Sequence, residues 1–217
     1  MIKQKKETNA PESLARTKSY DGEDVKKQLL TDQSGKCYLC ERVLTTDFEI
    51  EHLKSETHFP TLIQDWSNLF LSCRYCNGKK LENYDDILNP LETEVENVIK
   101  QEIDFQGNKA MFTNPTADEK VSKTIQLLNS IYNGTNRCRK IKEERFFEHI
   151  LSTINDFSKL VRDYLDNPSN ENMLAVKEEL SISKEALGFK YWIIKSNSRL
   201  ESEFASEIVW NKFEVKQ

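Results

Sequence analysis

The sequence lacks long apolar runs and contains little glycine. No apolar stretch among its 217 residues approaches the roughly 20 residues of a membrane-spanning helix. The basic start at residues 1–6 continues into polar residues, without the apolar segment of a signal peptide. We therefore expect a cytoplasmic protein with no membrane partner. Its six glycines form neither a glycine-rich phosphate loop nor a Gly-x-Ser-x-Gly elbow, which argues against two common classes of hydrolase.

An excess of positive charge is also missing. The chain has 31 Lys and Arg against 36 Asp and Glu, a net charge of −5. Non-specific affinity for nucleic acid depends largely on Lys and Arg meeting phosphates. An acidic chain can still carry a local basic strip, and Lys54, Arg74, Lys79 and Lys80 lie close to the motif described below. We expect that any nucleic acid is captured with the help of a partner.

Cysteine is scarce as well, yet four of the five cysteines are paired in sequence. Cys37 and Cys40 form one Cys-x-x-Cys pair, Cys73 and Cys76 form another, and Cys138 stands alone. In a reducing cytoplasm such pairs are metal ligands and not disulfides. Two pairs that close on one ion are the signature of a structural, tetrahedral zinc site. We expect Cys138 to be a bystander thiol.

Four further polar residues lie within or beside the span of the two cysteine pairs. Glu51 and His52 are adjacent, Asn68 follows sixteen residues later, and Asn77 adjoins the last cysteine. Because four thiolates already fill a tetrahedral zinc site, these side chains are free for other chemistry. A lone histidine is more often structural, as we expect for His149, and we expect a bystander at His58. For His52 the combined spacing favours a chemical role.

These residues resemble a known family, the HNH endonucleases. The resemblance rests on Glu51-His52, on Asn68-Leu69 and on Cys73-x-x-Cys76-Asn77-x-x-Lys80, with asparagine in place of the last histidine. The wider wording, with Phe59-Pro60 and Asp65-Trp66 between these motifs, is similar to the PtuB branch. That branch contains the HNH subunits of Septu anti-phage systems and also occurs in some retron-associated operons. The similarity covers roughly residues 35–82.

The resemblance implies a role for each site residue. His52 would be the general base that deprotonates water, and Asn68 would orient its imidazole. Glu51 and Asn77 would hold a catalytic Mg²⁺ or Mn²⁺, since carboxylate and amide oxygens are hard ligands. Lys79 and Lys80 would face the phosphate. The zinc held by the cysteines would be structural.

The resemblance also implies a substrate and partners. The expected function is metal-dependent hydrolysis of DNA phosphodiester bonds in anti-phage defence. The expected partner is an ABC-type ATPase, PtuA, and a retron reverse transcriptase with its RNA and DNA is a further candidate in the same complex. Two alternatives stay open from the sequence. One is a zinc-ribbon interaction module that cleaves nothing, and the other is an HNH toxin that cleaves RNA or tRNA.

The pattern of apolar residues predicts an α+β fold, and the resemblance implies a zinc-clamped ββα-metal (HNH) core followed by a mainly helical C-terminal region. We expect a flexible arm over residues 1–22, the nuclease domain with its connector over 23–112, and the helical region over 113–217. A strand or tight hairpin is expected at 42–52 and a second strand at 66–71, followed by a helix with Ser72 as its N-cap. Helices are further expected at 23–33, between Pro115 and a stop at Asn133-Gly134, and from there up to Pro168. Two more helices are expected at 170–181 and 184–206, and a small hairpin around Gly107 and Asn108.

Overall fold

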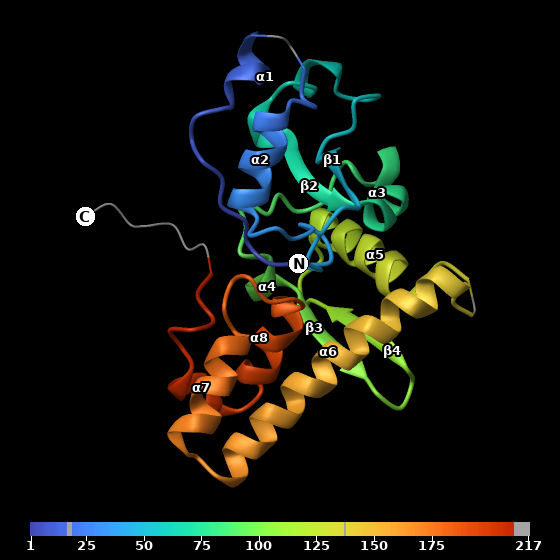
Figure 1. Ribbon diagram of the computed structural model, residues 1–217. Helices are drawn as coiled ribbons and strands as arrows, with labels where there is room; N and C mark the ends of the chain where they lie inside the picture. Colours follow the sequence, from blue (N-terminus) through green and yellow to red (C-terminus); the bar gives the residue numbers. More distant parts are fainter. Residues whose placement is uncertain (17–18, 137, 211–217) are drawn as a thin grey trace.

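The computed structural model describes residues 1–16, 19–136 and 138–210 (Figure 1). The N-terminal half holds α1 (Glu12–Arg16), α2 (Glu23–Asp32) and a two-stranded sheet, and the C-terminal half consists of helices. Helix α5 (Glu119–Asn133) lies between the two halves. This arrangement confirms the predicted α+β class. Residues 211–217, which the sequence assigns to the helical region, lie outside the described residues.

The sheet and the helix that follows it form a ββα unit. Strand β1 (Phe48–His52) pairs antiparallel with β2 (Leu69–Cys73), with Glu51 opposite Phe70. Helix α3 (Arg74–Lys80) begins directly after β2. Its N-cap is Cys73, whose sulfur accepts the Cys76 amide proton at 3.4 Å. The predicted N-cap, Ser72, is wrong by one residue because the strand runs on through it.

Both strands are shorter than the sequence predicts. Residues 36–44 form a knuckle, closed by an isolated bridge between Lys36 and Val43, so that β1 begins only at Phe48. Gly35, at φ 66°, places the chain in the left-handed region where this knuckle begins. On the other side, residues 66–68 form a 3₁₀ turn capped by the Asp65 side chain, which delays β2 to Leu69.

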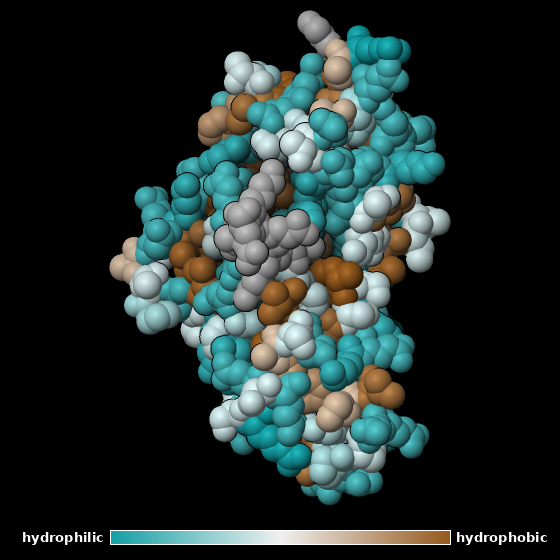
Figure 2. All heavy atoms as spheres, turned by 90° about the vertical axis from the view of Figure 1, so that its left-hand side faces the viewer, coloured by the Kyte–Doolittle hydropathy of each residue, from teal (hydrophilic) through white to brown (hydrophobic). Residues whose placement is uncertain are grey.

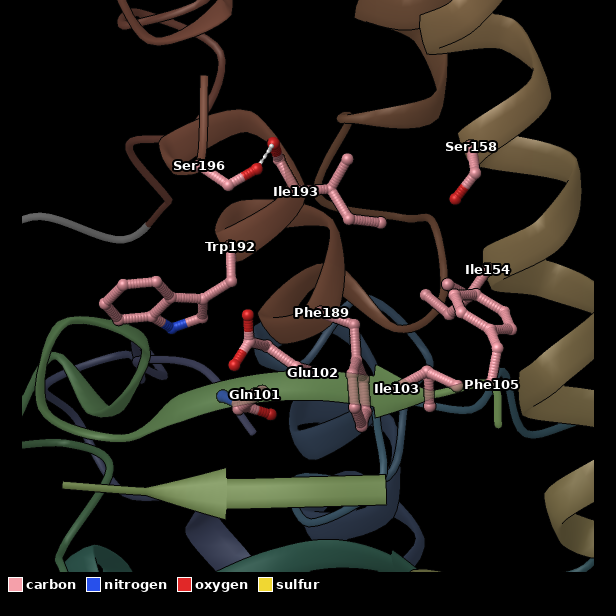
Figure 3. A pocket seen from close by; sticks show the side chains of 10 residues that line it. All are labelled: Gln101, Glu102, Ile103, Phe105, Ile154, Ser158, Phe189, Trp192, Ile193 and Ser196. Carbon is pink, nitrogen blue, oxygen red and sulfur yellow. Dashed lines mark hydrogen bonds between the residues drawn. The ribbon is translucent and has the colours of Figure 1, made fainter. Parts of the chain in front are cut away.

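The connector carries a second small sheet that joins the two halves. After the short helix α4 (Val95–Val98), strands β3 (Lys100–Asp104) and β4 (Lys109–Thr113) form the predicted hairpin. Figure 3 shows β3 beneath α8 (Leu187–Lys195), with Phe189 and Trp192 reaching toward the strand. The Trp192 indole donates to the Ile99 carbonyl at 3.0 Å. The hairpin therefore ties the connector to the C-terminal helices.

The predicted helices form with one exception. Helix α5 ends at Gly134, at φ 75°, and α6 (Ile141–Asp166) and α7 (Asn170–Glu179) follow. The predicted helix over 184–206 is divided into α8 and α9 (Ser198–Glu203). The break falls at Asn197, whose extended backbone and side chain cap α9 by accepting the Arg199 and Leu200 amides. Among the described helices none is long and apolar enough to cross a bilayer.

The first four residues are buried in the centre of the molecule, unlike the flexible arm expected from the sequence. Met1 packs in the larger apolar cluster, which extends from the N-terminal half to α5, α6 and α8, and Ile2 packs in the smaller cluster of the C-terminal helices. The Met1 amine lies 2.5 Å from Glu41, and the Lys3 amide donates to Glu96 at 2.8 Å. Apolar side chains and buried acceptors thus hold this segment between the two clusters. The face seen in Figure 2 is mostly hydrophilic outside small apolar groups.

Candidate active site

The two cysteine pairs meet at one point. The four Sγ atoms lie within 4.8 Å of one another, and all four residues are buried. Cys40 and Cys73 are separated by 3.9 Å between sulfurs. Zn–S bonds of about 2.3 Å place the sulfurs of a tetrahedral site about 3.8 Å apart, so the cluster has the right size for such an ion. The predicted convergence of the pairs is confirmed, and the four cysteines could hold a metal ion.

Neighbouring elements fix the cluster. The Tyr38 amide donates to the Leu71 carbonyl at 3.1 Å, which joins the first knuckle to β2. The Tyr38 ring stacks on Phe70 with 4.7 Å between centroids. From α5, the Tyr132 hydroxyl donates to the Cys40 carbonyl at 3.3 Å. The cysteine cluster is therefore anchored to both the sheet and the helix that separates the two halves.

Glutamates of β1 face α3 at every second position, as strand geometry requires. The Asn77 amide donates to Glu49 at 2.6 Å, and the Lys80 ammonium lies 2.9 Å from Glu51. Glu51 is 8% exposed. Burial raises its pKa to about 7, although Lys80 opposes the shift. A group that binds Glu51 as a carboxylate therefore competes with a proton near neutrality.

His52 points away from Glu51 along the strand, and its ring is held from three sides. Its Nε2 lies 2.9 Å from the Ile63 carbonyl oxygen, which only accepts, so Nε2 carries a proton. Its Nδ1 lies 3.1 Å from Glu56, and Tyr20 packs edge-on with centroids 4.7 Å apart. His52 is nearly buried. Nδ1 therefore faces an ionisable carboxylate, whereas Nε2 faces a fixed backbone carbonyl.

Three of the predicted site residues line one cavity. Glu51, His52 and Asn77 all border a volume of about 620 Å³, together with Tyr20 and Glu56. Neighbouring strand residues point to opposite faces, but β1 ends at His52, so both side chains reach the same cavity at the strand end.

Asn68 does not contact the imidazole of His52, contrary to the expectation that it orients this ring directly. Its side chain accepts the Lys54 amide at 2.8 Å and donates to the carbonyls of Lys54 and Leu62 at 3.0 and 3.1 Å. Leu62 precedes Ile63, whose carbonyl meets His52. Asn68 therefore fixes the loop that holds the histidine and acts on the ring only through it. The turn at 66–68 directs its amide into that loop.

The two lysines also differ from expectation. Lys80 is fully buried, donates to the His52 carbonyl at 2.8 Å and pairs with Glu51. Lys79 forms an ion pair with Glu143 of α6. Both ammonium groups are engaged within the fold, because α3 packs against β1 on one side and α6 on another. They support the site and its surroundings, and neither lines the cavity described above.

Several neighbours of the site were not identified from the sequence. Glu49 could have been found from its two-residue spacing to Glu51. Tyr20 and Glu56 carry no sequence signal, since only the folded chain brings Tyr20 to His52. His58, expected to be a bystander, lies 2.6 Å from Asp85, which also accepts from the amide and hydroxyl of Ser55. Although burial opposes it, these hydrogen bonds hold the pKa of Asp85 below its usual value.

Comparison with known proteins defines the class of this region. Residues 37–82 match the family model described as HNH endonuclease, and this range contains all four clustered cysteines and the predicted site residues. The segment therefore carries an HNH endonuclease domain.

A particular relative can also be named. Over 82 residues the chain is 35% identical to the Septu protein PtuB of Bacillus thuringiensis. The alignment covers 35% of this chain and 32% of that relative, so the chain spans about a third of the relative's length.

Proposed function

We propose that this protein is a metal-dependent HNH endonuclease that cleaves DNA within a Septu-type anti-phage defence complex. The observation that carries the proposal is the cavity at the end of β1. A buried carboxylate, a fixed histidine and an amide meet there, inside a segment that matches the HNH endonuclease family. The similarity to Septu protein PtuB supports the defence setting.

The four-cysteine cluster would hold Zn²⁺ in a structural role. Four buried thiolates leave no open position for water or substrate, unlike catalytic zinc sites with three protein ligands. The ion would clamp the first knuckle to the β2–α3 junction. Because Cys76 adjoins Asn77, that clamp also fixes the first turn of the helix that carries the site amide.

Glu51 and Asn77 fit a hard divalent cation such as Mg²⁺ or Mn²⁺. The Asn77 Nδ2 group is committed to Glu49, which leaves its Oδ1 atom as the available ligand. Carboxylate and amide oxygens are the ligands that these cations prefer. When bound, the cation would neutralise charge on the scissile phosphate and on the leaving oxygen. Lys80, paired with Glu51, keeps the carboxylate oriented.

His52 would act as the general base. With a proton fixed on Nε2 by the Ile63 carbonyl, Nδ1 would accept the proton of the attacking water once that water takes the place of the Glu56 carboxylate beside Nδ1. Asn68 holds the loop carbonyl in place, and through it the tautomer of the ring.

An ABC-type ATPase is the proposed partner, and it would compensate for the acidic balance of this chain. A retron reverse transcriptase with its RNA and DNA is a further proposed component. An RNA-cleaving toxin shares this site chemistry, so DNA and RNA substrates have to be compared directly. A zinc-ribbon module without cleavage would have no use for the buried Glu51 and the fixed His52.

The decisive experiment is His52→Ala in the full chain, tested alone and with its partner. We expect cleavage of DNA to fall by about 10²–10⁴-fold, as for the loss of a general base, with zinc content unchanged. The same assay with RNA and tRNA identifies the substrate. His149→Ala, a replacement on the exposed face of α6, is the control and should retain cleavage. Full activity of the His52 variant would refute the proposed site, and loss of zinc would make His52 a structural residue.

A further inference from the structure

Four basic side chains gather in one place on this acidic chain. Arg42, Arg74, Lys142 and Arg145 line a groove of about 530 Å³, and among its described lining residues Asp47 is the sole carboxylate. The first two come from the knuckle and from α3, and the other two from the first turns of α6. The fold therefore assembles a positive surface that is dispersed in the sequence.

Aromatic packing gives this groove a rigid floor. Tyr75 of α3 stacks on Phe146 of α6, with 4.7 Å between centroids and 26° between planes. The Tyr75 hydroxyl donates to the Ile131 carbonyl at 2.7 Å. Figure 1 shows α3 above the N-terminal part of α6, and the ion pair of Lys79 with Glu143 joins them. The basic side chains are thus presented on a fixed base.

The groove lies next to the candidate active site. Arg74 and Asn77 are three residues apart on α3, so they lie on the same face of the helix. Glu49 bridges them, because one oxygen accepts from Asn77 at 2.6 Å and the other lies 3.8 Å from Arg74. A chain bound at Asn77 would pass Arg74 and enter the groove.

The basic groups remain available to a ligand. Arg74 is 77% exposed and its contact with Glu49 is long, while Arg145 is 80% exposed beside Glu148 at 3.2 Å. Exposed ion pairs of this kind are worth less than about 1 kcal/mol, so a phosphate can replace them. The planar guanidinium group matches phosphate oxygens with two parallel hydrogen bonds.

We propose that this groove binds the sugar–phosphate backbone of the nucleic acid next to the scissile phosphate. The inference rests on the proposed nuclease function, to which it adds the path of the substrate. Guanidinium groups above an aromatic base recognise the charge of the phosphates and not the sequence of the bases. Binding in this groove is therefore independent of base sequence. Arg74, nearest to Asn77, contacts the phosphate closest to the cut, and Lys142 and Arg145 contact the phosphates beyond it.

The test compares two pairs of substitutions on one helix. Lys142→Gln/Arg145→Gln removes two charges from the groove, and Lys159→Gln/Arg162→Gln removes the same two residue types, at the same spacing, from an exposed stretch of α6 nearer its C-terminal end. The measurement is fluorescence anisotropy of the full chain with a labelled duplex of about 20 base pairs, between about 50 and 200 mM salt and without added divalent cation.

For the groove variant we expect affinity to fall on the order of tenfold, and the slope of log affinity against log salt to decrease by about 1.8, which corresponds to two lost phosphate contacts. The control variant should bind as the wild type does. Equal losses in both variants, or no loss in either, would overturn the inference. The inference would also be overturned by a groove variant that still binds DNA but from which poly-L-glutamate no longer displaces the DNA. The groove would then bind an acidic protein segment.

Hydrolysis of bis(p-nitrophenyl) phosphate separates this inference from the proposed function. That small diester reaches the cavity without needing the groove, so the groove variant should hydrolyse it at the wild-type rate with Mg²⁺ while its KM for DNA rises. A wild type that hydrolyses neither substrate contradicts the nuclease proposal, and the DNA-binding comparison still tests the groove. A groove variant with normal binding and normal cleavage of DNA contradicts the inference alone.

Discussion

Adjacent residues at the end of β1 have different surroundings. Glu51 turns toward α3 and shares a buried ion pair with Lys80, while His52 turns toward the loop that carries Ile63. Consecutive side chains of a strand must point to opposite faces, so one dipeptide supplies two environments. The residue that would hold the cation and the residue proposed as the base therefore come from opposite faces of one strand.

Alanine substitutions at the two asparagines should have different effects on stability and on cleavage. Asn68→Ala leaves three partly buried backbone groups without their partner, at a cost of up to about 1–3 kcal/mol for each unsatisfied group, so the melting temperature should fall clearly. Asn77→Ala loses one half-buried contact with Glu49 and should change the melting temperature little, yet lose cleavage that more Mg²⁺ partly restores. Thermal denaturation and Mg²⁺ titration measure both. Equal melting temperatures, or a reversed order, would contradict these assignments.

The raised pKa of Glu51 predicts how cleavage depends on Mg²⁺ and pH. With a pKa of about 7, the carboxyl holds a proton below neutrality, and a cation must displace it. The Mg²⁺ concentration for half-maximal cleavage should therefore be roughly tenfold higher at pH 6 than at pH 8. Glu51→Gln cannot titrate, and its residual activity should lack this shift. A requirement for Mg²⁺ that does not change with pH would exclude Glu51 as the ligand.

At the scale of elements, the ββα unit depends on contacts between segments more than on its own strands. Two strands of five residues form no stable sheet alone. The first knuckle, the β2–α3 junction and α5 all converge on the cysteine cluster, and Cys73 also caps α3. A metal ion there would hold together what the small sheet cannot.

Cysteine substitutions test this dependence with an internal control. Cys37→Ser removes one of four ligands, and since zinc binding in small metal-folded units contributes on the order of 10 kcal/mol, the protein should lose zinc and fold poorly. Cys138 is exposed and lies outside the cluster, so Cys138→Ser should change neither zinc content nor stability. Metal analysis and circular dichroism provide the readouts. Well-folded, zinc-free protein from either the wild type or Cys37→Ser would refute the structural zinc.

At the scale of the whole molecule, buried charges join the two halves. Glu41, directly after the first cysteine pair, accepts the Gly188 amide at 3.2 Å in the first turn of α8. The Lys36 ammonium donates to the Lys184 carbonyl at 2.8 Å. The knuckle that holds the cysteines is thereby docked onto the segment that leads into α8. These contacts link the cysteine cluster to the C-terminal helices.

Glu96 predicts a pH dependence of stability. Burial raises its pKa from 4.5 to about 7, so the folded protein holds this proton more tightly than the unfolded chain. The free energy of unfolding should therefore fall as pH rises from 4.5 to 7, by at most about 3 kcal/mol from this group.

Glu96→Gln keeps an acceptor for the Lys3 amide and cannot ionise. The free energy of unfolding of the variant minus that of the wild type should be larger at pH 8 than at pH 5. Urea denaturation at both pH values measures this difference, with the exposed Glu92→Gln as the control. A difference between variant and wild type that stays constant with pH would show that Glu96 does not titrate in this range.

The sequence alone determined the features that depend on near neighbours. The spacing of the cysteine pairs predicted one cluster, and Glu51-His52 with Asn77 predicted the residues that line one cavity. Apolar periodicity and Gly134 predicted α5 and its end. Each of these signals lies within a few residues of the feature that it specifies, or in a motif whose spacing sets the geometry.

Only the tertiary structure decided which distant groups meet. Lys80 was expected at a phosphate and is buried against Glu51, and Asn68 contacts a loop where the imidazole was expected. Residues 1–4 are buried because Met1 packs in one apolar cluster and Ile2 in the other, and both clusters include residues far away in the sequence. Burial and ion pairing depend on partners from other segments, and the local sequence does not indicate which residues those partners are.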